Sequence, residues 1–275
     1  MRLLTFRKDG GTRAGRLDGD QVVELADADV GALLARGDAG LDDARNATGA
    51  GRPLAELDLA PVILDPPKII CVGQNYLAHI TEQGAKVPEY PTLFNKYRRS
   101  LIGAHDDIVL PRVSDEVDWE VELTIVIGKH ARHVTGAAAE DAIFGYTILN
   151  DTSIRDWQRR TTQWMQGKAF ESSTPIGPAV VSKDELDAGN LRLWTEVDGT
   201  MMQDSSTSDL LFKLADVVAY CSVMITLEPG DVIATGTPSG VGFARNPPVF
   251  LQPGQTVRCG IDGIGELVNR AIKEQ

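Results

Sequence analysis

The sequence predicts an α+β protein that is mainly β. Short apolar stretches bounded by Gly, Asp and Pro far outnumber stretches with helical periodicity. Strands and helices also do not alternate along the chain, which favours a mainly antiparallel sheet over a doubly wound one. The 275 residues, of which 43% are hydrophobic and 24% charged, are typical of a globular protein with one large or two unequal domains.

Residues 1–60 are expected to form a small N-terminal domain that is rich in strands and has a structural role. Gly/Asp turns separate its apolar stretches, and no group of residues in it could carry chemistry. The predicted elements are strands at Leu3–Phe6, Arg13–Leu17 and Gln21–Leu25, a short helix at Asp29–Ala35 and an irregular segment at Asp38–Arg52.

Pro61–Pro67 is expected to be a linker, and residues 66–275 a larger main domain. This domain is predicted to begin with a buried strand, Lys68–Gly73, and a short helix, Asn75–Gln83, which ends at Gly84. Further strands are predicted at Pro91–Tyr97, Asp107–Leu110, Asp118–Gly128, Phe144–Asn150, Leu191–Val197, Val232–Thr235, Thr256–Ile261 and Gly265–Asn269. Further helices are predicted at Ala137–Ile143, with Thr135 as its N-cap, and at about Ser208–Cys221.

The formal net charge of -12 argues against nucleic acid or an anionic membrane as the main partner. A small anionic substrate is compatible with that charge, because a bound cation and nearby Arg and Lys residues reverse the field within one cleft. The N-terminus has no signal-peptide core, and no apolar run approaches about 18 residues, so we expect a cytoplasmic protein. Cys71, Cys221 and Cys259 are expected to be small core residues.

The stretch from Asp118 to Gly128 carries acidic residues on one face. With a period of two, Asp118, Glu120 and Glu122 share a face. The Cβ atoms of Glu120 and Glu122 would lie about 6–7 Å apart, where unpaired buried carboxylates repel each other and one takes up a proton. A divalent cation such as Mg²⁺, Mn²⁺ or Ca²⁺ removes both costs. The alternative is a solvated acidic face.

Asp151 strengthens the metal hypothesis, because it follows the apolar stretch Phe144–Asn150 at the point where a strand leaves the core. A carboxylate at that strand end could complete a set with Glu120 and Glu122, leaving other positions to water and substrate oxygens. Asp118 is then either a fourth ligand or an acceptor that supports the ligands.

Several further residues are candidates for catalysis or binding. His79 and Glu82 share a helix face at i, i+3 and form either a proton-abstracting pair or an exposed ion pair. Lys168, between Gly167 and apolar residues, could stabilise an anion or an enolate. Arg155 and Gln158 would lie near the same site on a helix, and Thr237 in a Gly-rich loop could bind a carboxylate.

Taken together, these stretches resemble the fumarylacetoacetate hydrolase family, over roughly residues 66–275. The N-terminal unit is similar to the family's small variable domain only loosely. The matching motifs are Lys68–Tyr76 with His79 and Glu82, Ser100–Gly103, Asp118–Leu123, Asn150–Gln158, Gly167–Phe170 and Gly230–Pro238.

The resemblance implies a mixed β-roll catalytic domain, usually found in a homodimer. It implies Mg²⁺ or Mn²⁺ held by Glu120, Glu122 and Asp151. It also implies that His79 with Glu82 is a base that activates water or moves a substrate proton. Lys168 would stabilise the enolate, and the implied substrate contacts are Arg155, Gln158 and Thr237.

Several residues depart from the family pattern without touching the metal set or the His–Glu pair. Gln74 stands where an apolar residue is usual, Glu171 where aspartate is frequent, and Arg98–Arg99 where residues are small. These departures concern the substrate, and the arginine pair could add a second anion contact.

We expect a metal-dependent hydrolase that cleaves a carbon–carbon bond in a β-diketo acid of the acylpyruvate, fumarylpyruvate or fumarylacetoacetate type. Its partner would be a small anionic 2-oxo acid, cleaved through a metal-stabilised enolate. One alternative keeps the site but catalyses decarboxylation of oxaloacetate, or isomerisation of a 2-hydroxyhepta-2,4-diene-1,7-dioate-like acid. Another is a non-catalytic dicarboxylate-binding protein, which would have no need of a base.

Overall fold

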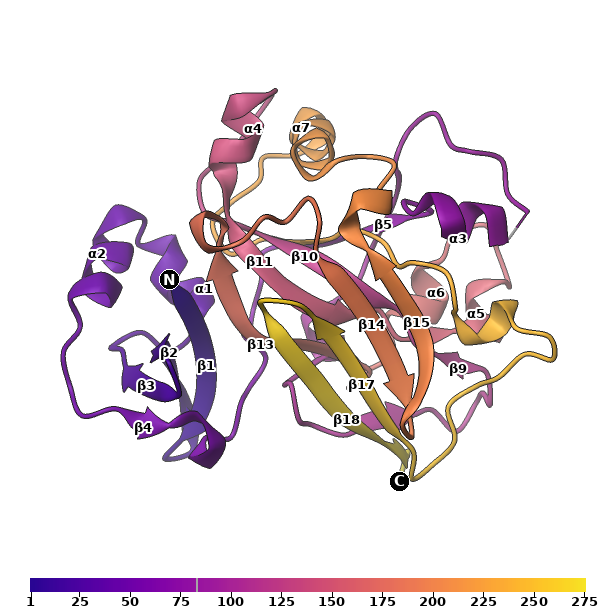
Figure 1. Cartoon of the computed structure of the whole chain (residues 1–275), viewed down its shortest axis with the longest axis horizontal. Coiled ribbons are helices and arrows are strands. Elements are labelled where there is room, and N and C mark those ends of the chain that lie inside the picture. Colours follow the sequence, from indigo (N-terminus) through magenta and orange to yellow (C-terminus); the bar gives the residue numbers. More distant parts are fainter. Residues whose placement is uncertain (83) are drawn as a thin grey trace.

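The computed structural model describes residues 1–82 and 84–275, and it is mainly β, as the sequence predicts (Figure 1). A large sheet has the strand order β4 (Arg52–Pro53), β3 (Gln21–Glu24), β2 (Gly11–Asp18), β1 (Arg2–Lys8), β13 (Thr174–Ser182), β11 (Ile143–Asn150), β10 (Val121–Ile127), β16 (Val232–Ala234), β5 (Ile69–Gly73), β6 (Thr92–Asn95), with β7 (Leu101–Ile102) beside β13. Its pairings are antiparallel except for β16 with β5 and β13 with β7.

A second sheet has the order β15 (Thr200–Ser206), β14 (Arg192–Val197), β17 (Thr256–Ile261), β18 (Gly265–Lys273), β8 (Ile108–Leu110). Strand β9 (Val117–Asp118) pairs with β12 (Ser153–Ile154). The central strands of the two large sheets pack against each other and bury apolar side chains such as Leu123, Ile148 and Leu267 between them. This core fixes β10 and β11, on which the candidate site is built.

Short helices lie around the sheets. They are α1 (Val30–Ala35), α2 (Asp38–Asn46), α3 (Leu77–Glu82), α4 (Ala137–Ala142), α5 (Arg155–Gln158), α6 (Met165–Lys168) and α7 (Leu214–Met224). Single 3₁₀ turns occur at Leu54–Glu56, Arg98–Ser100, Lys183–Glu185, Thr207–Asp209 and Gly242–Ala244. Helices α3, α5 and α6 gather at the end of the molecule opposite the N-terminal strands (Figure 1). The predicted last residue of the α3 helix, Gln83, lies outside the described residues.

The N-terminal strands extend the large sheet. Strand β1 pairs with β13 through Arg2 with Val181 and Leu3 with Val180. The N-terminal β region is therefore hydrogen-bonded to the catalytic part of the chain, while a domain boundary at residues 60–66 stays a prediction.

The prediction of an irregular segment at Asp38–Arg52 was wrong, because residues 38–46 form α2. Gly40 and Ala44 lie four residues apart and are its buried residues. A Cβ on Gly40 would lie 2.2 Å from the carbonyl oxygen of Leu33 in α1. The helix therefore packs through small residues at close range and lacks the apolar stripe that marks most surface helices.

Two long strands, β13 and β15, and the two-residue strands β4, β7 and β12 were missed, and the acidic stretch was predicted as one continuous strand. Strand β13 contains Pro175 and Pro178, which sequence patterns disfavour in a central strand. Its pairing with β11 is irregular beside Pro178, and Pro175 lies beyond that pairing, opposite Ile102 of β7. Strand β15 (Thr200–Ser206), which is mostly polar, was also missed. The acidic stretch breaks at Trp119–Glu120, between β9 and β10, and both faces of β10 are buried.

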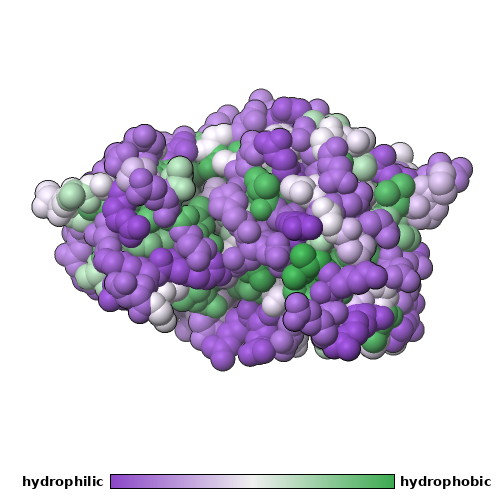
Figure 2. Space-filling view, turned by 90° about the horizontal axis from the view of Figure 1, so that it is seen from below, coloured by the Kyte–Doolittle hydropathy of each residue, from purple (hydrophilic) through white to green (hydrophobic). Residues whose placement is uncertain are grey.

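Smaller features of the fold bear on the remaining predictions. Thr135 is not the N-cap of α4, because Gly136 occupies that position without a side-chain bond. The three cysteines are buried and unbridged, as expected. Among the described residues, every helix is too short or too polar to cross a bilayer. Figure 2 shows a face on which hydrophilic residues predominate and hydrophobic residues form small separate groups.

Candidate active site

Three buried carboxylates meet where β10 and β11 begin and end. Glu120, Glu122 and Asp151 each offer an oxygen, and these oxygens lie within 4.8 Å of one another. The antiparallel pairing of Val121 with Asn150 brings the start of β10 beside the end of β11. The amide of Asp151 donates to the carbonyl of Glu120 at 2.8 Å, which fixes that approach. The structure thus brings together the three residues that were predicted to bind a metal.

Asp118 lies outside this group and supports it. Its carboxylate accepts from Arg155 Nε at 2.8 Å and from the backbone amides of Gly242 and Phe243 at 2.7 and 3.1 Å. Asp118 therefore holds Arg155 and the Gly242 turn in place. The break after β9 explains why Asp118 does not follow the period-two pattern of the two glutamates.

Three buried cations surround the carboxylates. Lys168 Nζ lies 2.6 Å from Glu120 Oε2 and 2.7 Å from Asp151 Oδ2. Arg155 Nη2 lies 2.6 Å from Glu120 Oε1. Lys96 Nζ donates to Asp151 Oδ1 at 2.7 Å and to the carbonyl of Thr152 at 3.1 Å. Among the described residues no such cation lies within bonding distance of Glu122, which accepts a hydrogen bond from the Gly236 amide at 2.8 Å.

These contacts affect the two glutamates in opposite ways. Burial opposes ionisation of Glu120, but the charges of Lys168 and Arg155 outweigh it and lower the pKa of Glu120 to about 2. Burial, together with the nearby charges of Asp151 and Glu120, raises the pKa of Glu122 well above its usual range. With Glu122 ionised and Asp118 included, four carboxylates face three cations, so one negative charge is uncompensated. A hard divalent cation beside Glu122 fits this oxygen-rich group.

The predicted His–Glu pair is formed on α3. His79 Nδ1 lies 3.0 Å from Glu82 Oε2, and Glu82 Oε1 accepts from the Gly240 amide at 3.0 Å. Burial opposes ionisation of Glu82, but the bonds from His79 and Gly240 outweigh it and lower the pKa of this carboxyl. Glu82 therefore stays anionic at neutral pH and orients the imidazole through Nδ1, which directs Nε2 away from Glu82.

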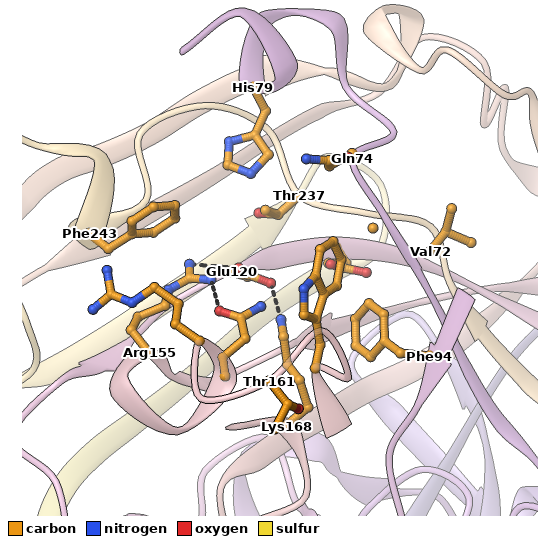
Figure 3. A pocket seen from close by; sticks show the side chains of 15 residues that line it. Val72, Gln74, His79, Phe94, Glu120, Arg155, Thr161, Lys168, Thr237 and Phe243 are labelled. Carbon is orange, nitrogen blue, oxygen red and sulfur yellow. Dashed lines mark hydrogen bonds and ion pairs between the residues drawn. The ribbon is translucent and has the colours of Figure 1, made fainter. Parts of the chain in front are cut away.

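These groups line one cavity of about 300 Å³, shown in Figure 3. His79 projects from one side, and Glu120, Arg155 and Lys168 lie opposite it, with Thr237 between them. The lining residues are Val72, Gly73, Gln74, His79, Phe94, Glu120, Glu122, Arg155, Gln158, Arg159, Thr161, Trp164, Lys168, Thr237 and Phe243. Seven predicted site residues thus line one cavity. The other two, Asp151 and Glu82, bond to Lys168 and His79 of its lining.

Two of the predicted substrate contacts are already hydrogen-bonded to the protein. Gln158 accepts from Arg155 Nη1 at 2.9 Å. The hydroxyl of Thr237 donates to the Val121 carbonyl at 3.0 Å and accepts from Gln203 Nε2 at 2.9 Å. Both line the cavity, and the bonds fix their orientation there.

Sequence reasoning missed several residues of the site. A lone lysine such as Lys96 gives no sequence signal for burial against a carboxylate. Phe94 and Trp164 meet edge to face at 5.5 Å and form an apolar wall. Arg98 and Arg99, for which a second anion contact was expected, do not line this cavity, and they pair with Asp65 and Glu171 at the surface. The same pairing gives Glu171 a surface role.

The fold and the site define an enzyme with a buried acidic metal site at one end of a mixed β architecture. Residues 68–272 match the family model described as fumarylacetoacetate (FAA) hydrolase C-terminal. The chain belongs to the fumarylacetoacetate hydrolase family. The buried Glu/Glu/Asp set is consistent with the divalent metal site of that family.

Known relatives carry different activities. The human protein named oxaloacetate tautomerase FAHD2A, mitochondrial, is 42% identical over 246 residues, covering 87% of this chain and 78% of the relative. A fumarylacetoacetate hydrolase from Exiguobacterium antarcticum superposes with a TM-score of 0.89 at 33% identity, covering both chains in full. A 5-carboxymethyl-2-hydroxymuconate delta-isomerase from Mycobacterium smegmatis superposes with a TM-score of 0.83 at 38% identity, again over both full chains.

Proposed function

We propose that this enzyme interconverts the keto and enol forms of oxaloacetate in a divalent-metal-dependent reaction. The observation that carries the proposal is the placement of the His79–Glu82 pair across one small cavity from Arg155, Lys168 and the carboxylate set. A base on one side and positive charge on the other suit removal of a proton next to a carbonyl. The similarity to the human oxaloacetate tautomerase supports this choice among the family's reactions.

Glu120, Glu122 and Asp151 would hold Mg²⁺ or Mn²⁺, with Ca²⁺ a weaker candidate. A divalent cation there would act as a Lewis acid toward the oxygens of a 2-oxo-carboxylate. Lys168 and Arg155 keep their positive charge, because neighbouring carboxylates offset burial and raise the pKa of both groups. They orient the acidic side chains and add positive charge where the enolate oxygen develops.

His79 removes a proton from C3 of the keto form, and Glu82 stabilises the imidazolium that results. The enolate oxygen takes up a proton from solvent, and His79 returns its proton to solvent, which gives the enol. The reverse sequence gives the keto form. Gln158 and Thr237 are held by Arg155, Gln203 and Val121 and so offer fixed polar atoms to the substrate.

The test is to follow the approach to keto–enol equilibrium of oxaloacetate by its enol absorbance, with Mg²⁺ or Mn²⁺ present. We expect a rate proportional to enzyme concentration that disappears in EDTA and in Glu120→Ala. A rate no faster than that of metal and buffer alone would contradict the proposal.

A second candidate is hydrolysis of a carbon–carbon bond in an acylpyruvate or fumarylpyruvate. The anchoring of Glu82 to Gly240 favours it, because a fixed His–Glu pair also activates water. Product analysis with acylpyruvates, fumarylpyruvate, oxaloacetate and hydroxymuconate-like acids separates hydrolysis, decarboxylation and isomerisation from tautomerisation. A non-catalytic dicarboxylate-binding role would be favoured if His79→Ala left every activity and affinity unchanged.

The homodimer and the cytoplasmic location also stay predictions. Light scattering coupled to gel filtration tests the first, and fractionation of cells that express the tagged protein tests the second.

A further inference from the structure

The buried cations of the cavity are already bound to carboxylates of the protein. Lys168 bridges Glu120 and Asp151, and Lys96 bonds Asp151 without lining the cavity. Arg155 pairs with Asp118 and Glu120. These cations balance the acidic group, so none of them is placed primarily for a second carboxylate of the substrate.

Arg159 is the cavity-lining cation in the described part of the chain that stands outside this buried network. It caps α5, and its amide donates to the Arg155 carbonyl at 3.1 Å. Its guanidinium pairs with Glu116 Oε2 at 2.5 Å, and the side chain is 55% exposed. An ion pair this open to water contributes little and exchanges readily for another anion. Arg159 is therefore a cation at the cavity mouth that a ligand can recruit.

A substrate with two carboxylates leaves a negative charge at the site that one further cation would balance. The buried group has one uncompensated negative charge, which a divalent cation turns into one positive charge. A dicarboxylate adds two negative charges, so one more cation balances the complex. With its 2-oxo-carboxylate end at the acidic group, the substrate would direct its second carboxylate toward the mouth. Trp164 and Phe94 make one wall apolar, so the polar side with Gln158, Arg159 and Thr161 is left for that group.

We propose that Arg159 is a specificity-determining residue that binds the second carboxylate of a dicarboxylic 2-oxo acid, in exchange for Glu116. The proposal rests on the proposed function in one respect, which is that the 2-oxo-carboxylate end of the substrate lies at the acidic group. It makes the enzyme select dicarboxylates over monocarboxylates by charge at the cavity mouth. Arg155 then has the different task of holding the acidic side chains.

The test compares two ligands that differ only in the second carboxylate, oxaloacetate and pyruvate, by calorimetric titration of the Mn²⁺-loaded protein. In Arg159→Ala we expect oxaloacetate to bind about tenfold more weakly, the loss typical of a charge-assisted bond at a partly exposed site. The affinity for pyruvate should change less than about twofold, since pyruvate has no second carboxylate to contact Arg159. Arg159→Lys should recover part of the lost affinity for oxaloacetate, because lysine keeps the charge but lacks the paired donors of the planar guanidinium.

Arg160→Ala is the matched control. Arg160 is the next residue and is also exposed, but it stacks on Trp157 at 3.6 Å and does not line the cavity. Its removal should change neither affinity. Glu116→Gln removes the competing anion, so it should leave oxaloacetate binding equal or tighter. Thermal unfolding of each variant checks that the fold is kept.

The assignment would be overturned if Arg159→Ala bound oxaloacetate and pyruvate equally more weakly, or if neither ligand bound more weakly. Failure of the proposed function would look different. If the wild type binds oxaloacetate more tightly than pyruvate through Arg159 but does not speed keto–enol exchange, the specificity role stands and the reaction is wrong. If the wild type speeds the exchange and Arg159→Ala keeps its KM, the specificity role falls alone.

Discussion

The ammonium of Lys96 lies 2.7 Å from Asp151 Oδ1, and both side chains are fully buried. One carboxylate of the proposed metal set therefore contacts a buried protein cation, and Lys168 contacts its other oxygen. Such a group depends on its balance of charges, because each buried ion is costly unless it is paired. The first two predictions follow from this balance.

Lys96→Met should destabilise the metal-free protein by about 3 kcal/mol, because it leaves buried carboxylates with one cation fewer. Added Mn²⁺ should restore more stability in this variant than in the wild type, since the acidic group then has a larger excess of negative charge. Thermal unfolding with and without metal measures both effects. Lys129→Met, which removes an exposed partner of Asp141, is the control and should not change Tm. If Mn²⁺ raised the Tm of Lys96→Met no more than that of the wild type, the proposed charge balance would be wrong.

Glu122→Gln should abolish metal binding without destabilising the metal-free protein. The raised pKa of Glu122 reflects burial beside Asp151 and Glu120, and a neutral amide removes that repulsion. At a metal concentration of 100 times Kd, the wild type should gain about 2.7 kcal/mol from Mn²⁺, and the variant none. Differential scanning calorimetry in EDTA and in Mn²⁺ gives the comparison. A similar metal-induced rise in Tm in both proteins would rule out Glu122 as a ligand.

Glu82→Gln should lower kcat and change how stability depends on pH. The pKa of Glu82 in the folded protein lies below its ordinary value of 4.5. The contact with His79 and Gly240 therefore stabilises the fold above that value, and its contribution is lost as the pH falls through the folded pKa. The wild type should have the higher Tm near neutral pH, and the difference should shrink in acid. A Tm difference that stays constant with pH would contradict the ionised pairing.

Trp164→Ala should open the apolar wall to longer substrates. Trp164 packs so closely over Gly73 that a Cβ there would lie 2.1 Å from the indole. We expect the ratio of kcat/KM for a long acylpyruvate over oxaloacetate to rise about tenfold in this variant, the scale of a small change in pocket volume.

Gly73→Ala should shift the same ratio in the same direction, since the added methyl group displaces the indole. Gly189→Ala, in an exposed turn with room for the methyl group, is the control. An unchanged ratio in both Trp164→Ala and Gly73→Ala would mean that this wall does not limit substrate length.

The reacting centre was largely predictable because its residues follow local rules. His79 and Glu82 share a face at i, i+3, and the helix brings Nδ1 and Oε2 to 3.0 Å. Glu120, Glu122 and Asp151 stand beside or within two apolar strands, and antiparallel pairing of those strands is enough to bring them together. The supporting residues were less predictable. Lys96 and Trp164 lie 55 and 44 residues from Asp151 and Glu120, so no local pattern connects them.

The sequence by itself indicated a mainly β protein with carboxylates on one strand face and a His–Glu pair on one helix face, because period-two and helical spacing act over a few residues. The resemblance of its motifs added the family. The tertiary structure decided the rest. Pairing of β1 with β13 joined the N-terminal strands to the large sheet, close packing of Gly40 turned an apparently irregular segment into a helix, and burial matched three cations to the acidic group. These outcomes depend on contacts between distant segments, where burial outweighs local preference.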